Sequence, residues 1–169
     1  PTGEVLAIDV SAGQVARGRA IQGRELPWLR FECMDMRSLP PALPAFDRIT
    51  GNLSVMFFRP NRFEAVRGLV ERLNPGGQLV LTFPSYGTFD SLWQRVDQAM
   101  IQQGLIKERE RFQDYLKERP SVQDGRDWLE ALGLERVEAM EYPLEVATGP
   151  GHEFLHHPLL RGTALLPPR

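Results

Sequence analysis

The sequence predicts an α/β protein built on a mostly parallel, doubly wound sheet, with helices on both faces that make three αβα layers. In the first half of the chain, short apolar runs alternate with amphipathic stretches of about ten to fifteen residues, and such helices connect parallel strands. The 169 residues leave room for roughly one domain of about 150 residues. With 42% hydrophobic and 25% charged residues, the composition is that of a folded globular chain.

Four strands are predicted in the first half. Residues 5–8 form a continuous apolar run, which is typical of a strand covered on both faces. Residues 29–33 alternate apolar and polar side chains, as a second strand does. Residues 46–50 begin a third strand, and residues 78–83 form a fourth.

Two helices are predicted between these strands. Ser11 is a good N-cap for a helix that ends near Gly23, a plausible stop signal. Asn61 begins a second helix, whose single apolar stripe ends before the Asn-Pro-Gly-Gly turn at 74–77. Each helix therefore connects two strands that we expect to run parallel.

The second half is predicted to be mainly helical. Residues 88–120 carry many charges beside one apolar stripe, and we expect them to form a helical insertion or lid within a single domain that spans the chain. Another helix fits residues 122–132, followed by one or two strands over 134–147 that break near Pro143. The tail, residues 149–169, is rich in Gly and Pro and weakly patterned.

The composition disfavours several classes of function. Twenty basic against twenty-two acidic residues give a net charge of −2, so no overall basic field attracts nucleic acid. One cysteine, Cys33, suits a reducing compartment, and we expect a cytoplasmic protein. No apolar run approaches the ~20 residues that span a bilayer, which disfavours membrane insertion. His152, His156 and His157 lack companion ligands at metal-binding spacing, so no metal is expected.

The residues that follow the strands are the candidates for ligand binding, because ligands bind beyond the carboxyl ends of the strands in open α/β sheets. They are Asp9, Asp35, Asn52 and Ser85. Asp9 stands where an acid can accept hydrogen bonds from both hydroxyls of a ribose. Asp35 stands where it can accept from an adenine amino group while Met36 covers the ring face.

Four segments, in this order, resemble the class I S-adenosylmethionine-dependent methyltransferases, in particular the small-molecule enzymes related to ubiquinone and biotin biosynthesis. Glu-Val-Leu-Ala-Ile-Asp-Val-Ser at 4–11 is similar to the family's second strand with its ribose-binding acid. Residues 31–40 resemble the adenine-side segment. Phe-Asp-Arg-Ile-Thr-Gly-Asn-Leu-Ser at 46–54 resembles the fourth strand and the turn that faces the methyl donor. Leu-Asn-Pro-Gly-Gly-Gln-Leu-Val-Leu at 73–81 resembles the turn into strand five.

The resemblance implies a Rossmann-like fold, with a seven-stranded sheet ending in an antiparallel hairpin, and S-adenosylmethionine as the cofactor. The residues implied to bind the cofactor are Asp9, Val10, Asp35, Met36, Asn52 and Leu53. The family's first strand and glycine-rich loop would lie upstream of Glu4, and we expect that they have been truncated. The alternative is that residues 8–13 are a degenerate glycine loop, but they contain one glycine and would place Asp35 one strand–helix unit too early.

A small molecule is the expected methyl acceptor. The Gly-Asn-Leu-Ser turn at 51–54 lacks the Asn-Pro-Pro-aromatic motif of enzymes that methylate planar amino groups such as that of adenine, and Cys33 lies in the wrong strand for cytosine-C5 chemistry. Aromatic side chains are candidates for an acceptor pocket, because their faces also attract a sulfonium. Such residues are more often part of a core. They are Phe57, Phe58, Tyr86, Phe89 and Trp93. No catalytic base is identified.

Two alternatives remain open. A non-catalytic, methyltransferase-like module would bind a partner through residues 88–120. A nicotinamide-dependent dehydrogenase would share Asp9, but neither Asp35 nor the turn at 74–77 supports it.

Overall fold

The computed structural model describes residues 3–22 and 26–145, apart from the side chain of Phe57. The chain divides into two compact units. The first consists of Pro1–Thr50 and Phe63–Val80, and the second of Gly51–Arg62 and Leu81–Arg169.

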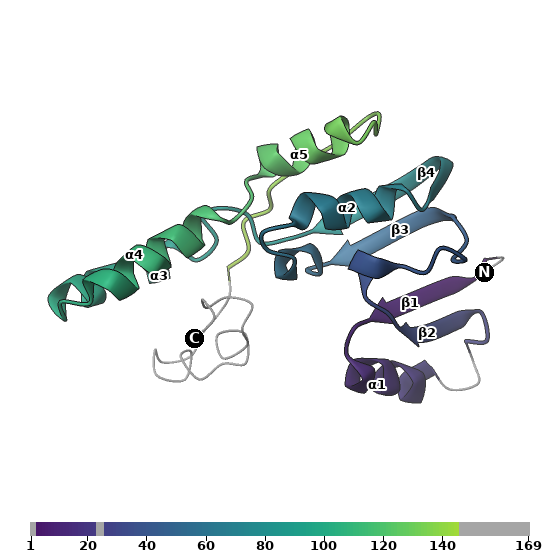
Figure 1. Cartoon of the computed structure of the whole chain (residues 1–169), viewed down its shortest axis with the longest axis horizontal. Helices are drawn as coiled ribbons and strands as arrows, with labels where there is room; N and C mark the ends of the chain where they lie inside the picture. Colours follow the sequence, from purple (N-terminus) through teal and green to yellow (C-terminus); the bar gives the residue numbers. More distant parts are fainter. Residues whose placement is uncertain (1–2, 23–25, 146–169) are drawn as a thin grey trace. The chain divides into compact units, whose positions relative to one another are not determined.

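The first unit begins with a strand, a helix and a parallel strand. β1 (Val5–Asp9) pairs in parallel with β2 (Leu29–Cys33), and Asp9 lies opposite Cys33. α1 (Ala12–Gln22) connects the two strands and packs against both (Figure 1). These three elements confirm the first strand–helix–strand unit of the sequence analysis.

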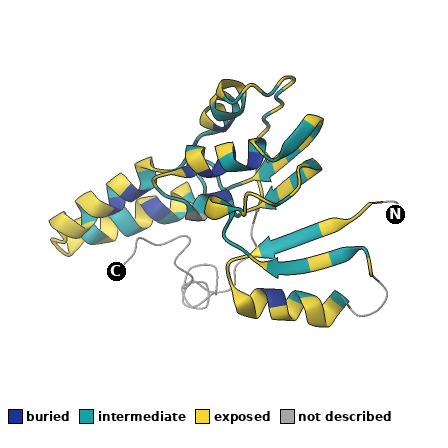
Figure 2. Ribbon diagram, turned by 45° about the vertical axis from the view of Figure 1, so that its right-hand side comes forward, coloured by how far each residue is buried: buried dark blue, intermediate teal, exposed yellow. Residues whose placement is uncertain are grey.

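The faces of β1 and β2 are less covered than the apolar run at 5–8 predicts. No residue of either strand is buried, and the central residues of β1 are of intermediate exposure (Figure 2). α1 contributes one buried side chain, Val15. Gly18 lets the helix approach the ring of Phe31, since a Cβ at Gly18 would lie 2.4 Å from that ring. The expectation of a strand covered on both faces is therefore wrong for the described residues.

A second pair of strands forms a separate sheet. β3 (Phe46–Asn52) pairs with β4 (Leu73–Thr82), and α2 (Arg62–Val70) connects them. Hydrogen bonds join the starts of the two strands and also their ends, so the strands run parallel. The buried side chains of α2 include Val66 and Leu69, from the predicted apolar stripe.

β4 begins earlier than predicted, at Leu73, and the Asn-Pro-Gly-Gly segment at 74–77 belongs to the strand. Pairing with β3 explains the difference. The side-chain amide of Asn74 donates to Oδ1 of Asp47 at 2.9 Å. Gly77 lies so close to the neighbouring backbone that a Cβ would be 2.8 Å from the carbonyl oxygen of Asn74 and 3.2 Å from that of Asp47.

The strand pairing matches the doubly wound order. In a sheet of order 3-2-1-4-5-6, strands two and three pair, strands four and five pair, and strand one lies between the pairs. The described strands make two pairs, β1–β2 and β3–β4, which correspond to the pairs two–three and four–five of that order. The fold is therefore α/β and Rossmann-like.

The second unit contains a helical hairpin. α3 (Asp90–Gln102) and α4 (Ile106–Lys117) pack against each other, and the short helix η2 (Val55–Phe57) precedes them in the chain (Figure 1). Trp93 and Phe112 form the centre of their core. The partly buried residues around this centre are Met56, Phe89, Leu92, Val96, Met100 and Leu116. The helical character predicted for residues 88–120 is confirmed, while their role as an insertion or lid stays a prediction.

α5 (Val122–Ala131) confirms the next predicted helix, but the strand predicted after it is wrong for residues 134–145. These residues are irregular, because Arg136 has a φ of 55° and the carbonyl of Val137 accepts from the side chain of Arg126 at 2.6 Å. The antiparallel hairpin is thus not confirmed. The predicted tail at 149–169 lies outside the described residues.

Candidate functional site

Asp9 lies at the carboxyl end of β1 and is exposed. Its Oδ1 accepts the N–H of Ser11 at 2.7 Å, which fixes the turn into α1. Its other carboxylate oxygen has no hydrogen-bond partner among the described residues. Val10, the next residue, is 67% exposed although it is apolar. One end of the strand therefore presents a carboxylate oxygen beside an uncovered apolar side chain.

Asp35 lies at the same edge of the sheet, because the N–H of Met34 donates to the carbonyl of Asp9 at 3.1 Å. Asp35 caps the short helix η1 (Met36–Ser38), and Met36 is of intermediate exposure. The Nε of Arg37 donates to both carboxylate oxygens of Asp35 at 3.0 Å. This hydrogen bonding lowers the pKa of Asp35. Asp35 is thus ionised at neutral pH, and a ligand amino group would compete with Arg37 for it.

Asn52 and Leu53 lie at the carboxyl end of β3, in the second unit. The hydroxyl of Thr82 donates to Oδ1 of Asn52 at 2.5 Å, and the N–H of Leu53 donates to the carbonyl of Thr82 at 3.0 Å. Leu53 has a φ of 57° and is 42% exposed. Left-handed backbone at a non-glycine residue is costly and clusters at functional sites. The turn that was predicted to face the methyl donor is therefore held in an unusual conformation.

The aromatic candidates do not share one environment. Trp93 is 3% exposed, and its indole N–H donates to the carbonyl of Thr88 at 2.8 Å. Phe89 packs edge-on against Trp93, with ring centroids 6.4 Å apart. Tyr86 is 61% exposed, and the side chain of Phe57 is outside the described part. Trp93 and Phe89 thus belong to the core of the helical hairpin.

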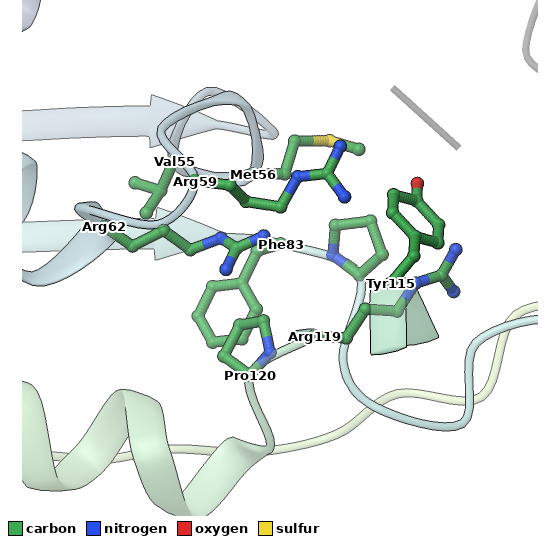
Figure 3. A pocket seen from close by; sticks show the side chains of 9 residues that line it. Val55, Met56, Arg59, Arg62, Phe83, Tyr115, Arg119 and Pro120 are labelled. Atoms are coloured by element: carbon green, nitrogen blue, oxygen red, sulfur yellow. The ribbon is translucent and has the colours of Figure 1, made fainter. Parts of the chain in front are cut away.

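A small hollow that is open to solvent lies elsewhere in the second unit (Figure 3). Its apolar wall includes Val55, two residues after Leu53, and Phe83, the residue after β4. It therefore lies just beyond the carboxyl ends of β3 and β4, where open α/β sheets bind ligands. Tyr115, near the end of α4, forms part of the far wall.

Three arginines also line this hollow, which we call the arginine hollow: Arg59, Arg62 and Arg119. Arg62 is 8% exposed, and its Nη1 donates to the carbonyl of Glu118 at 2.7 Å. Burial, and next to it the charge of Arg59, lowers the pKa of Arg62. The guanidinium of Arg59 lies 4.3 Å from the centre of the Tyr115 ring. Sequence analysis missed all three, because charge at these positions looks like ordinary surface.

The described ranges contain neither a metal site nor a membrane-spanning helix. No group of three or more His, Cys, Asp or Glu side chains there could hold a metal ion. The predicted chance cluster of His152, His156 and His157 lies outside those ranges. None of the described helices combines the length and the apolar character that crossing a bilayer requires.

Comparison with known proteins points to one family. Residues 1–77 match the family model described as a methyltransferase domain. A candidate methyltransferase from Bacillus halodurans superposes with a TM-score of 0.54 at 25% sequence identity, over 77% of this chain and 52% of that one. The plantazolicin methyltransferase BpumL, solved with a triazolic substrate analogue and S-adenosylhomocysteine (SAH), superposes with a TM-score of 0.51 at 17% identity, over 79% of this chain and 47% of that one. No curated protein is significantly similar in sequence.

The chain thus spans about half the length of the solved structures that it matches. The second of them supports the fold alone, while the first and the family model support the family. The matched segment contains β1, β2 and β3, with Asp9, Asp35 and Asn52 at their ends. Residues 1–77 are therefore similar to a methyltransferase domain, and the comparisons support the predicted resemblance to class I S-adenosylmethionine-dependent methyltransferases.

Proposed function

We propose that this protein transfers a methyl group from S-adenosylmethionine to a small-molecule acceptor. The observation that carries the proposal is the match of residues 1–77 to the methyltransferase-domain model, since this segment ends its first strand on the exposed carboxylate of Asp9. The match to the methyltransferase-domain model also supports S-adenosylmethionine as the cofactor, and BpumL, which shares the fold, was solved with SAH.

The residues present fit the nucleoside part of the cofactor. Asp9 would accept from the ribose hydroxyls with the oxygen that Ser11 does not occupy. The exposed side chain of Val10 would contact the adenine ring. Asp35 would accept from the adenine amino group only in exchange for its contact with Arg37.

The protein needs few reactive side chains for this chemistry. S-adenosylmethionine, when bound, supplies the methyl group on a positively charged sulfur. Holding two reactants in line contributes roughly 7–11 kcal/mol of barrier lowering by itself. We assign this positioning role to Asn52 and Leu53, because Thr82 holds both in place at the end of β3.

Titration calorimetry with SAH tests the proposal. SAH is titrated into the 169-residue chain and into a version that is extended upstream to the native start of the gene. Micromolar binding by the extended version supports the proposal. Binding by the chain alone as well would place the glycine-rich loop within residues 8–13, and binding by neither would favour the non-catalytic module.

The Asp9 variants test the site itself. A hydrogen bond to a charged group contributes about 1.5–3 kcal/mol, so Asp9→Ala should weaken SAH binding about tenfold to more than a hundredfold. Asp9→Asn keeps an oxygen that can accept from the N–H of Ser11 and loses only the charge. A lower SAH affinity in this variant would therefore reflect a lost contact with the ligand and not a disturbed turn. Asp127→Ala, which removes an exposed carboxylate on α5, is the control. Equal affinities in all three variants would refute the role of Asp9.

A further inference from the structure

The arginine hollow contains buried donors that lack acceptors. Nε of Arg62 and Nη2 of Arg119 are both buried, and neither has a hydrogen-bond partner in the part of the chain that the structure describes. Buried polar groups almost always have a partner, so each exception needs an explanation. Arg62 is more than nine-tenths buried, and Figure 3 shows its guanidinium between Arg59 and Phe83 in the hollow.

Positive charge is in excess around these donors. The charged side chains that act on Arg62 are Arg59, Arg119 and Glu118. Glu118 is the single acid among them, and its Oε2 lies 3.6 Å from Nη1 of Arg59, with about half of the Glu118 side chain exposed. Three guanidinium groups thus face one carboxylate, which already has a partner at the rim.

The guanidinium groups are also held in place before any ligand arrives. Nη1 of Arg119 donates to the carbonyl of Thr88 at 2.8 Å, and its guanidinium lies 5.3 Å from the centre of the Trp93 ring. Arg59 stacks over Tyr115. Planar guanidinium groups that are fixed in this way match the paired oxygens of a carboxylate or a phosphate.

We propose that the arginine hollow binds the anionic group of the methyl acceptor, a carboxylate or a phosphate. This inference rests on the proposed function, because it identifies the hollow at the ends of β3 and β4 as the acceptor site. Val55, Met56 and Phe83 supply an apolar wall beside the arginines. The acceptor class is therefore an apolar, most simply aromatic, molecule that carries one acidic group.

Calorimetry with three probes at constant ionic strength tests the proposal on the full-length protein. The probes are benzoate, phenyl phosphate and the neutral benzyl alcohol. We expect saturable binding of at least one anion and none of the alcohol, and the tighter anion identifies the acidic group. Absence of binding by both anions, or equal binding of the alcohol, would overturn the proposal.

Variants of the half-buried arginines locate the binding. Arg59→Gln and Arg119→Gln should each lower the affinity for the anion about tenfold to a hundredfold, since each removes a charged hydrogen-bond donor. Arg95→Gln removes an exposed charge from α3 and should change nothing. An equal loss of anion affinity in all three variants would show that surface charge in general attracts the anion, and it would refute the proposed site.

Arg62 is followed without mutation, because its burial makes a variant prone to misfold. The Nε–H resonance of Arg62 should shift on titration with the anion, and an unchanged resonance at saturation would contradict the proposal. SAH titrated into the same samples separates the two proposals. Anion binding without SAH binding would refute the methyl-transfer proposal and support the anion site. SAH binding without anion binding would refute the anion site alone.

Discussion

Gly125 offers a direct test of how α5 shapes the arginine hollow. It is buried on α5, and a Cβ there would lie 2.8 Å from Cζ and 3.3 Å from Cε1 of the Phe83 ring. Gly125→Ala gains about 1 kcal/mol of helix propensity. Forcing an extra methyl against a packed ring costs about 1–3 kcal/mol. We expect a net loss of about 1 kcal/mol in the free energy of unfolding, measured by urea denaturation.

A second helical glycine, without a neighbouring ring, measures the gain in helix propensity by itself. At Gly13 in α1, a Cβ would meet only Oγ of Ser11, at 3.7 Å, which is an ordinary contact. Gly13→Ala should therefore stabilise the protein by about 0.5–1 kcal/mol. An equal stabilisation by Gly125→Ala would refute the packing of Phe83 against α5.

A double-mutant cycle gives the coupling between the two positions. Phe83→Leu shortens the side chain that the new methyl meets, so the double variant should be more stable than the sum of the two changes by about 0.5–3 kcal/mol. Additivity to within about 0.3–0.5 kcal/mol would show that the two side chains do not meet. Gly125→Ala alone should also weaken benzoate binding, because the displaced ring lines the hollow.

Two further predictions concern local structure. Ser121→Ala removes the side-chain acceptor for the N–H of Asp124 at the start of α5 and should cost about 1 kcal/mol in urea denaturation. Hydrogen bonds from Ser121 lower the pKa of Asp124 below its unfolded value of 3.8. Their contribution to the free energy of unfolding is therefore present above pH 3.8 and is lost as the pH falls through the lower folded pKa. The Ser121→Ala variant should consequently lose less stability than the unmodified protein over that acid range. Gly77→Ala would place a methyl against two backbone carbonyls, of Asn74 and Asp47, and should lower the melting temperature through a cost of about 1–3 kcal/mol, whereas the α1 glycine variant should raise it.

The strand–helix order could be predicted from the sequence because its signals are local. The run at 5–8 became β1, the alternating residues at 29–33 became β2, and Ser11 directly precedes α1. Apolar periodicity and capping residues act within a few positions of each other, and a single sequence contains all of that information.

Elements that depend on a neighbouring strand could not be predicted in the same way. The segment at 74–77 looks like a turn because it contains Pro and two Gly, but pairing with β3 makes it a strand. The alternating residues at 134–145 look like a strand, but no strand pairs with them in the described part of the chain. In both cases the hydrogen-bonding partner decides the structure, as is typical of strands.

Asp9 and the arginines of the arginine hollow also differ in whether the sequence alone could identify them. Asp9 could be identified because it directly follows a strand. Arg62 is notable only because the carbonyl of Glu118, 56 residues away in the sequence, accepts its Nη1 and no group accepts its Nε among the described residues. A buried charge with a free donor arises from the meeting of segments 55–62, 83–84 and 115–120. Because the acceptor's chemistry depends on that meeting, its acidic group could be inferred from the structure and not from any one stretch of sequence.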